Sequence, residues 1–237
     1  MTNDAPDFQL EALSEAAWLL RLGNTMDTAL NARVHAMASL LHAVLPGVEC
    51  VPAYASVLLR FDRAAWPVDA TMIDGEHLRE TITALWDRVP ELATPTREVV
   101  LPVWYAGEDI DDVAAHAQLT TTEVIARHTA ATYRVAMLGF APGFPYLLGL
   151  DPSLAMPRRG TPRTLVPAGS VAIGGLQTGI YPRALPGGWQ LIGRTPLRLF
   201  DLSAAVPSLL QPGDRVRFRA IDEREYTRLA TEAGTTP

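Results

Sequence analysis

Arginine is the residue type whose distribution first suggests chemistry in this chain. The segment between Val124 and Phe200 holds eight arginines against one acid, Asp151, which is a net charge of +7. Because the whole chain of 237 residues carries −6, the remainder carries −13. A basic centre in an acidic protein favours a small anionic ligand over nucleic acid, which the acidic flanks would repel. The alternative is that several of these arginines form ion pairs with acids from elsewhere in the fold.

Polar side chains within this basic segment could form a binding site. Arg163 carries the fork-shaped guanidinium group that suits a carboxylate or a phosphate. Gln177 can both donate and accept a hydrogen bond, which suits the amide of a ring. Arg194 stands between turn residues in IGRTP, which would hold it rigidly. The candidate residues for binding a substrate or a phosphate are Arg163, Ser170, Gln177, Thr178, Tyr181 and Arg194.

His128 is the candidate catalytic residue for proton transfer. It ends a short predicted helix beside the basic segment, where the helix dipole favours the charged imidazolium. Its ordinary pKa suits acid–base catalysis near neutral pH. The alternative is a purely structural role in capping that helix end. The other histidines show no metal-ligand spacing with one another, so the sequence predicts no metal site.

Several other classes of chemistry are excluded. All 20 basic residues are arginine, so a P-loop lysine, a Schiff-base lysine and a biotinylated lysine are impossible. One cysteine, Cys50, cannot form an internal disulfide. No run of about 18 apolar residues occurs, and the acidic N-terminus is unlike a signal peptide. We therefore expect a cytoplasmic protein that contacts no membrane.

The elements that must position these residues fall into two groups. In the first, residues 27–45 predict a helix, because apolar side chains recur at steps of three and four, and Thr25 or Asp27 can cap it. Residues 75–88 predict a second helix, and residues 16–22 and 54–61 predict strands. The pattern indicates an open sheet covered by two helices. The stripe on the first helix consists of Leu30, Val34, Met37, Leu41 and Val44.

The second group begins beyond residues 91–97, where no periodic pattern occurs. Two short helices are expected at about 109–117 and 121–129, the latter opened by a capping box from Thr120 to Glu123. Many short segments then alternate with turns, which is typical of a closed barrel or a sandwich. The expected strands lie in 98–105, 132–140, 170–175, 177–182 and 214–221, and residues 186–201 predict a turn followed by one long or two short strands.

Glycine and proline are unusually dense between Gly139 and Pro196, with 11 glycines and 9 prolines in 58 residues. Aromatic residues interrupt them, as in GFAPGFPYLLGL at 139–150, so we expect ordered loops rather than disorder. Such loops shape a binding site or, alternatively, only the corners of a barrel. We expect the arginines to surround a dry barrel mouth, where amides of Gly169, Gly174 and Gly175 could form an anion nest.

Three strings carry a resemblance to a known family. HTAATYRVAMLGFAPGFPYLLGL, TPRTLVPAGSVAIGGLQTGIYP and PGGWQLIGRTPLRLFD resemble the family called allophanate hydrolase subunit 1. NARVHAMASLL and VPAYASVLLRFD extend the likeness to the N-terminal half. The resemblance implies an α+β fold with a small N-terminal α/β domain, residues 1–93, and a cyclophilin-like β-barrel domain, residues 94–237. The family includes the histidine-kinase inhibitor KipI and the B component of the bacterial ATP-dependent 5-oxoprolinase.

The resemblance also implies a function. It is strongest toward the 5-oxoprolinase component, which acts with A and C subunits to convert 5-oxo-L-proline to L-glutamate and is inactive alone. ATP, with its magnesium ion, would be shared with the C subunit. The alternatives are a kinase inhibitor and a subunit of an allophanate- or urea-type amide hydrolase. Ala130-Ala131 stands where the family usually has Ser-Gly. Family positions for the site map onto His128, Arg163, Gln177, Tyr181 and Arg194.

Overall fold

A computed structural model describes residues 7–62, 75–89 and 97–234 of the chain. The chain divides into two compact units, Met1–Thr94 and Pro95–Pro237. The predicted boundary between residues 93 and 94 lies outside the described residues. Among the helices that are described, none is long and apolar enough to cross a membrane.

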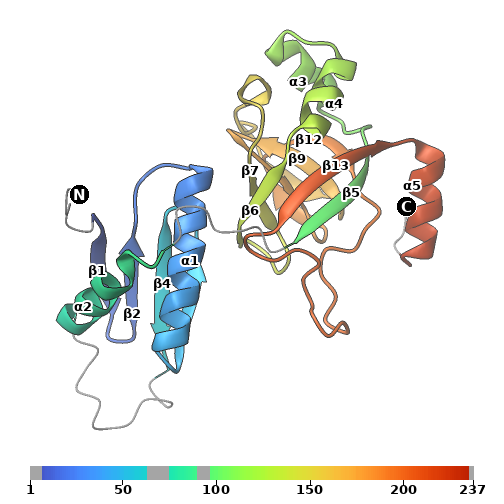
Figure 1. The fold of residues 1–237 in the computed structure, drawn as a ribbon. Coiled ribbons are helices and arrows are strands. Elements are labelled where there is room, and N and C mark those ends of the chain that lie inside the picture. The colour runs from blue at the N-terminus through green and yellow to red at the C-terminus, as the bar shows by residue number, and fades with distance from the viewer. Residues whose placement is uncertain (1–6, 63–74, 90–96, 235–237) are drawn as a thin grey trace. The chain divides into compact units, whose positions relative to one another are not determined.

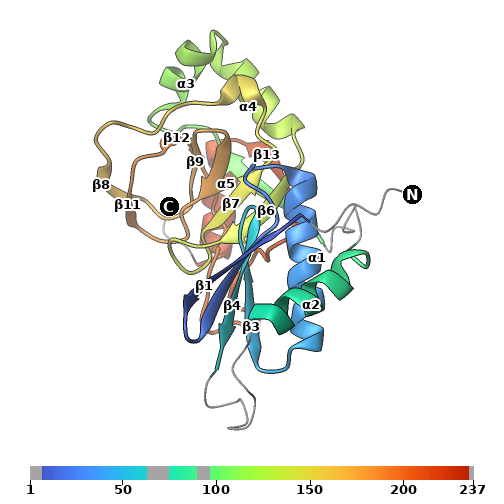
Figure 2. The ribbon, with the colours of Figure 1, turned by 90° about the vertical axis from the view of Figure 1, so that its left-hand side faces the viewer.

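The first unit is an antiparallel sheet of four strands in the order β1-β2-β4-β3. Two helices pack on one face of this sheet, as Figure 2 shows. The predicted open sheet with two covering helices is therefore confirmed. The elements of this unit are β1 (Gln9–Ser14), β2 (Ala17–Arg21), α1 (Thr28–Val44), β3 (Val48–Pro52), β4 (Ser56–Phe61) and α2 (Gly75–Trp86).

Helix α1 follows the predicted stripe for most of its length. Val34, Met37 and Leu41 are fully buried, but Val44 is 43% exposed because the helix ends there and Leu45 takes its place in the core. The cap is Asp27, whose Oδ1 accepts a hydrogen bond from the Leu30 amide at 2.8 Å. The sequence pattern does not predict strand β1, because five of its six residues are exposed and show no alternation.

The second unit is built around a closed barrel of seven strands in the order β10-β7-β6-β13-β5-β12-β9, which closes because β9 pairs with β10. The predicted barrel is thus confirmed, and the sandwich alternative is excluded. Strand β13 runs parallel to β5, although the two are more than a hundred residues apart in the chain. The barrel strands are β5 (Glu98–Trp104), β6 (Tyr133–Leu138), β7 (Pro145–Leu148), β9 (Ser170–Gly174), β10 (Gln177–Ile180), β12 (Gln190–Arg194) and β13 (Arg215–Ile221).

Alternation along β13 shows how the sequence determines which side of a strand is wet. Val216 and Phe218 are buried in the barrel interior, whereas Arg215, Arg217 and Arg219 are exposed, as predicted. Helices α3 (Ile110–Ala117) and α4 (Thr121–Ala130) cover one end of the barrel (Figure 1) and contribute apolar side chains to its core.

Four further elements complete the unit. Strands β8 (Arg163–Val166) and β11 (Leu185–Gly187) form a separate two-stranded sheet beside the barrel (Figure 2). A short 3₁₀ helix, Pro152–Leu154, follows β7, and helix α5 (Glu223–Glu232) follows β13. The sequence pattern predicts none of β8, β11 and α5. Their signals are weak, because β8 and β11 are very short and α5 buries only Tyr226 and Ala230.

The capping box of α4 gives a first prediction. The Thr120 Oγ1 atom accepts from the Glu123 amide at 3.2 Å, and Glu123 Oε2 accepts from the Thr120 amide at 2.8 Å. We expect Thr120→Ala to lower the free energy of unfolding by about 1 kcal/mol, because this reciprocal capping is lost. Urea unfolding measures this change. Thr122→Ala is the matched control, since Thr122 is exposed in the same turn, and an equal loss in both variants would contradict the prediction.

Candidate functional site

The second unit carries a pocket on the outer face of the barrel wall. Side chains alternate along β9: Val171 and Ile173 enter the barrel core, whereas Ala172 joins a separate cluster with Tyr181 and Trp189. This second cluster forms the floor of a cavity of about 290 Å³. The site is therefore not at a barrel mouth, as the sequence led us to expect, because the strand alternation places these aromatic side chains outside.

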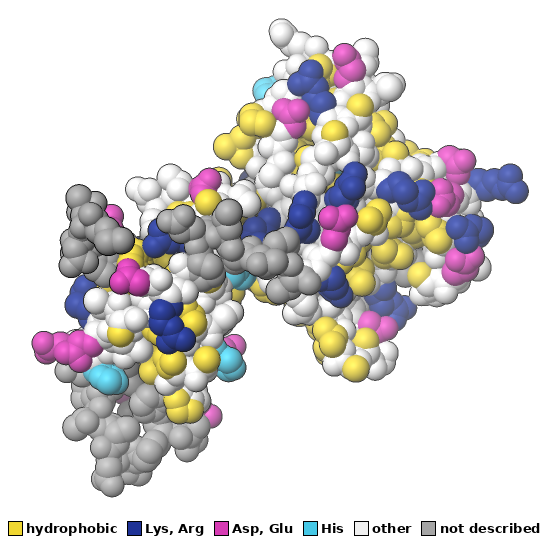
Figure 3. All heavy atoms as spheres, viewed as in Figure 1, with side chains coloured by type: hydrophobic (Ala, Val, Ile, Leu, Met, Phe, Trp, Pro, Cys, Tyr) yellow, Lys and Arg dark blue, Asp and Glu magenta, His cyan; other side chains and the backbone are white. Residues whose placement is uncertain are grey.

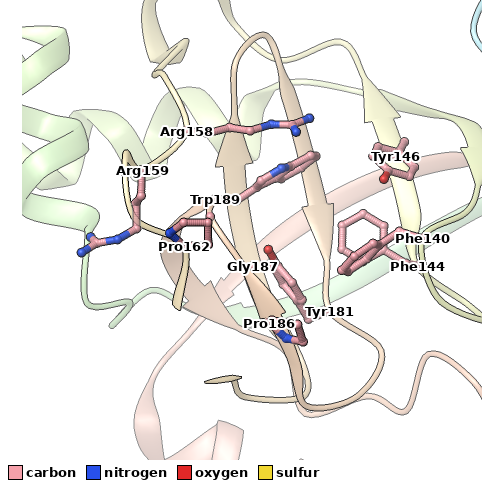
Figure 4. A pocket seen from close by; sticks show the side chains of 11 residues that line it. Phe140, Phe144, Tyr146, Arg158, Arg159, Pro162, Tyr181, Pro186, Gly187 and Trp189 are labelled. Atoms are coloured by element: carbon pink, nitrogen blue, oxygen red, sulfur yellow. The ribbon is translucent and has the colours of Figure 1, made fainter. Parts of the chain in front are cut away.

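Segments that are distant in the sequence meet around this pocket. The loop before β7, the loop before β8, and the segment from β11 to β12 each supply part of the wall (Figure 4). None of the described residues that line it is acidic. The lining residues are Phe140, Phe144, Tyr146, Arg158, Arg159, Pro162, Tyr181, Pro186, Gly187, Gly188 and Trp189.

Aromatic rings pack edge to face to make the floor rigid. The ring of Phe144 lies 5.2 Å from that of Tyr181 and 5.7 Å from that of Trp189, both at 85°. Glycines permit this packing, because a Cβ on Gly174 would come within 2.6 Å of the Trp189 ring. A Cβ on Gly187 would come within 2.2 Å of the Tyr181 hydroxyl. These two glycines therefore serve the close approach of rings to backbone.

The three arginines near the pocket differ in their partners. The Arg158 guanidinium lies over the Trp189 ring, 5.6 Å from its centroid, and Figure 4 shows it reaching across the pocket. Arg159 turns away from the pocket in the same view, toward Asp109. Arg163 also binds Asp109 and does not line the pocket. The alternative of internal ion pairing is therefore correct for two of these three arginines.

Asp109 is the buried acid that organises this arginine pair. Its side chain is 3% exposed, and Oδ1 accepts hydrogen bonds from Arg163 Nη2 at 2.7 Å and from Arg159 Nη1 at 2.9 Å. Oδ2 accepts from the Leu191 amide at 2.6 Å. One carboxylate thus connects the start of α3, the loop before β8 and strand β12. These hydrogen bonds raise the pKa of Arg163, with Asp109 as the main cause.

Two other arginines of the basic segment also lie beside acids. Arg198 pairs with Asp201 at 3.1 Å, and Arg127 lies 4.0 Å from Asp151. Figure 3 shows arginines of this unit interspersed with acidic side chains. The positive charge of the segment is therefore partly neutralised by ion pairs in the folded protein. Whether an anion can bind depends on the arginines at one site rather than on the net charge of the segment.

The structure brings only Tyr181 of the predicted binding residues into the pocket. Ser170 is buried opposite Arg194 across the β9–β12 pair, and Arg194 Nε donates to the Ala168 carbonyl at 2.8 Å. The Arg194 guanidinium lies 5.9 Å from the Tyr226 ring on α5. Gln177 is buried at the opposite end of the β9–β10 hairpin from Ser170. These predicted residues do not share one cavity.

Two of the three amides of the predicted anion nest are not available to an anion. The Gly169 amide donates to the Tyr181 carbonyl at 2.7 Å, and the Gly175 amide donates to the Met156 carbonyl at 2.8 Å. Both donors are therefore used within the backbone. Among the described residues, no group of three or more His, Cys, Asp and Glu side chains could hold a metal ion.

His128 lies in the core rather than at a pocket. It is fully buried and stacked 4.5 Å from the ring of Phe218. The Thr178 hydroxyl donates to the Ala172 carbonyl at 3.0 Å, so it must accept from His128 Nε2 at 3.1 Å. Nδ1 then accepts from the Tyr105 hydroxyl at 2.7 Å. Both nitrogen atoms of the neutral ring are satisfied.

This environment does not support the predicted role of His128 in proton transfer. Burial lowers its pKa from 6.5 to about 3, so the imidazole stays neutral near pH 7. With no exposed atom, it cannot reach a ligand in this conformation. The structural alternative fits better, because the His128 carbonyl also accepts from the Tyr133 hydroxyl at 2.9 Å at the end of α4.

The residues that sequence reasoning missed are Arg158, Arg159 and Asp109. The adjacent arginines in MPRRGTPR, between two prolines, were the available signal in the sequence. The pocket also affects its tyrosines. Burial raises the pKa of Tyr181, and this rise is opposed first by a hydrogen bond with the Trp189 backbone and then by the positive charges of Arg158 and Arg163. The pKa of Tyr146 is also raised by burial, and the positive charge of Arg158 opposes part of this rise.

Comparison with known proteins gives a consistent result. The model of the family described as carboxyltransferase domain, subdomain C and D, matches residues 8–210. The B component of 5-oxoprolinase from Bacillus subtilis (strain 168) is 41% identical over 230 residues, which cover 92% of this chain and 95% of that protein. Its counterpart from Haemophilus influenzae is 50% identical over 149 residues, which cover 62% of this chain and 70% of that protein.

A solved structure shares the fold. The crystal structure of TTHA0988 superposes with a TM-score of 0.73 at 37% sequence identity and covers 87% of this chain. This chain spans 40% of that longer protein.

Proposed function

We propose that this chain, which belongs to the carboxyltransferase domain C and D family, is the B component of a 5-oxoprolinase. The B components of bacterial 5-oxoprolinases are its relatives in the comparisons above. One observation carries the proposal: 41% identity extends over 92% of this chain and 95% of the Bacillus subtilis protein. Two chains that match almost from end to end have the same domain content. The resemblance noted in the central strings of the sequence agrees with this assignment.

The proposed reaction converts 5-oxo-L-proline to L-glutamate with ATP. The lactam carbonyl is a poor electrophile, so its oxygen first takes the terminal phosphoryl group of ATP, and ADP leaves. Water then adds to the ring carbon, the carbon–nitrogen bond breaks, and the nitrogen takes a proton, which leaves an acyl phosphate. A second water releases phosphate and the carboxylate of glutamate. In this scheme the B and C components activate the lactam together, and the A component completes hydrolysis.

The described residues suit binding of the lactam ring rather than the whole reaction. The pocket is small and largely aromatic, which suits a compact ring from which water must be excluded. A second, more open hollow of about 460 Å³ shares Arg158 and Arg159 with the pocket and also includes Thr161, Gln190, His116 and one acid, Asp112. This hollow is where a phosphoryl donor would approach the ring.

The residues of this chain do not favour nucleotide binding by the chain alone. The sequence has no lysine for a phosphate-binding loop, and the described residues hold no carboxylate cluster for magnesium. We therefore propose that ATP and its magnesium ion are held jointly with the C component. It follows that the chain is inactive alone.

The test is reconstitution from the three purified components with ADP release as the measurement. We expect release that requires 5-oxo-L-proline, ATP and all three chains, with no release when this chain is omitted. The control replaces this chain with its Thr122→Ala variant, which should support the full rate.

Two outcomes would contradict the proposal. ADP release that does not depend on 5-oxo-L-proline would remove the substrate assignment. Release that is unchanged without this chain would show that it is not part of the enzyme. In either case the alternatives, a histidine-kinase inhibitor and a subunit of an allophanate- or urea-type amide hydrolase, are tested by kinase autophosphorylation and by ammonia release from allophanate.

A further inference from the structure

Two arginines are among the described residues that line the pocket, and Arg158 is the one that forms no ion pair with an acid. Arg159 is bound to Asp109, whereas Arg158 makes no ion pair within the described residues. No described residue that lines the pocket is acidic, and Asp112, which lines the adjoining open hollow with Arg158, forms no ion pair with it. An anion that entered the pocket would therefore find Arg158 as its nearest partner.

The backbone on both sides of Arg158 is anchored. The Pro157 carbonyl accepts from Gln190 Nε2 at 2.9 Å, and the Arg159 amide donates to the Gly188 carbonyl at 2.7 Å. The guanidinium group itself lies on the Trp189 ring, 5.6 Å from the centroid. Arg158 itself is exposed, so these backbone contacts fix where its side chain begins and leave the guanidinium group accessible to a ligand at the pocket.

The rest of the pocket selects the remainder of the ligand. A volume of about 290 Å³ lies at the small end of the range for ligand sites, so it suits a small ring better than a whole nucleotide. Phe144, Tyr146, Tyr181 and Trp189 offer apolar contact on several sides. The combination indicates a compact cyclic molecule with one negative group.

We propose that this pocket binds a small cyclic carboxylate, with the Arg158 guanidinium paired with the carboxylate and the ring held against the aromatic side chains. The inference rests on the proposed function only for the choice of 5-oxo-L-proline as the probe. Arg158 is in this view the residue that selects acids over neutral lactams. Arg159 and Arg163 position the loop through Asp109 and do not contact the ligand.

Calorimetric titration of the purified chain tests the assignment. The probes are 5-oxo-L-proline, 2-pyrrolidinone, which lacks the carboxylate, and cyclopentanecarboxylate, which lacks the lactam. We expect Arg158→Gln to weaken binding of both carboxylates at least tenfold and to leave 2-pyrrolidinone within twofold. Arg158→Lys should be intermediate, because it keeps the charge and loses the fork. Arg183→Gln is the matched control, since Arg183 is exposed, in the same basic segment and outside the pocket.

The assembled enzyme supplies a second measurement if the isolated chain binds too weakly to titrate. There, Arg158→Gln should raise KM for 5-oxo-L-proline at least tenfold while KM for ATP stays within twofold. Carboxylate affinity or KM that survives Arg158→Gln would overturn the inference, as would an increase confined to KM for ATP. Absence of 5-oxo-L-proline-dependent ADP release with wild-type chain would instead count against the proposed function, and the titration with cyclopentanecarboxylate would still decide the role of Arg158.

Discussion

Asp109→Ala is expected to lower the free energy of unfolding by about 2–4 kcal/mol, because it leaves Arg159 and the Leu191 amide without their acceptor and leaves Arg163 with only the exposed Glu108. The side chain of Asp109 is 3% exposed, and that of Arg163 is 17% exposed. Water can therefore replace the lost carboxylate only in part. Arg159, at 36%, is more accessible, so we place the loss below that of a fully buried ion pair. Urea unfolding at neutral pH gives the measurement.

The neighbouring residue provides the control for Asp109. Glu108 also binds Arg163 Nη2, at 3.1 Å, but its side chain is 72% exposed. We expect Glu108→Ala to change the free energy of unfolding by less than about 1 kcal/mol. Equal losses for the two variants would show that burial of Asp109 is unimportant. For Asp109→Asn we expect a loss of unfolding free energy between those of the two alanine variants. The amide keeps one acceptor oxygen, but its NH₂ group faces either the arginines or the Leu191 amide, which are themselves donors.

Asp109 should also affect the pocket through the loop before β8. It holds Arg159, and Arg159 is the residue next to Arg158. If Asp109→Asn remains folded, we expect weaker carboxylate binding together with an unchanged preference for carboxylate over neutral lactam. A positioning residue loosens the site, whereas loss of Arg158 would remove the preference itself.

His128 is expected to make the protein sensitive to mild acid. Its pKa is about 3 in the folded chain and 6.5 ordinarily, so the unfolded chain takes up a proton in this window and the folded chain does not. Stability contributed by the neutral ring is therefore complete above pH 6.5 and is lost as the pH falls toward 3. The slope approaches roughly 1.4 kcal/mol per pH unit, so about 2 kcal/mol should be lost over the first two pH units below 6.5.

Comparison of variants isolates this contribution, because carboxylates such as Asp151 and Asp201, whose pKa values are lowered by hydrogen bonds, also destabilise the fold in acid. We expect His128→Asn to be less stable than wild type by about 2 kcal/mol in mild alkali and to show a shallower decline with acid. Exposed His116, replaced by glutamine, should leave the slope unchanged. A His128→Asn variant with the wild-type slope would show that His128 titrates normally.

His128→Asn also separates structure from catalysis. The enzyme hypothesis drawn from the sequence makes His128 a proton-transfer group, but Tyr105 and Thr178 occupy both ring nitrogens. We expect the variant, kept at a pH where it is folded, to retain most 5-oxo-L-proline-dependent ADP release in the reconstituted enzyme. A loss of about a hundredfold or more with an intact fold would restore the catalytic role.

The sequence by itself determined the two helices of the first unit and most strands of the second, but not β1, β3, β7, β8, β11 and α5, nor the choice between a barrel and a sandwich. The helix of residues 28–44 follows from apolar steps of three and four with an Asp27 cap, and the wet face of β13 follows from strict alternation. Capping, periodicity and turn chemistry act between residues a few positions apart, so they can be seen in the chain as it is written. The central strings also indicated the family.

Only the tertiary structure decided which arginines are available to a ligand. In the sequence Arg158, Arg159 and Arg163 are equivalent cations within six residues. Two of them meet Asp109, which lies about 50 residues earlier, and the third lies on Trp189, which lies about 30 residues later. The sequence places His128 at a helix end, where it could be accessible, but in the folded barrel it is fully buried. Ion pairing and burial depend on contacts between distant segments, and those contacts form only when the barrel closes.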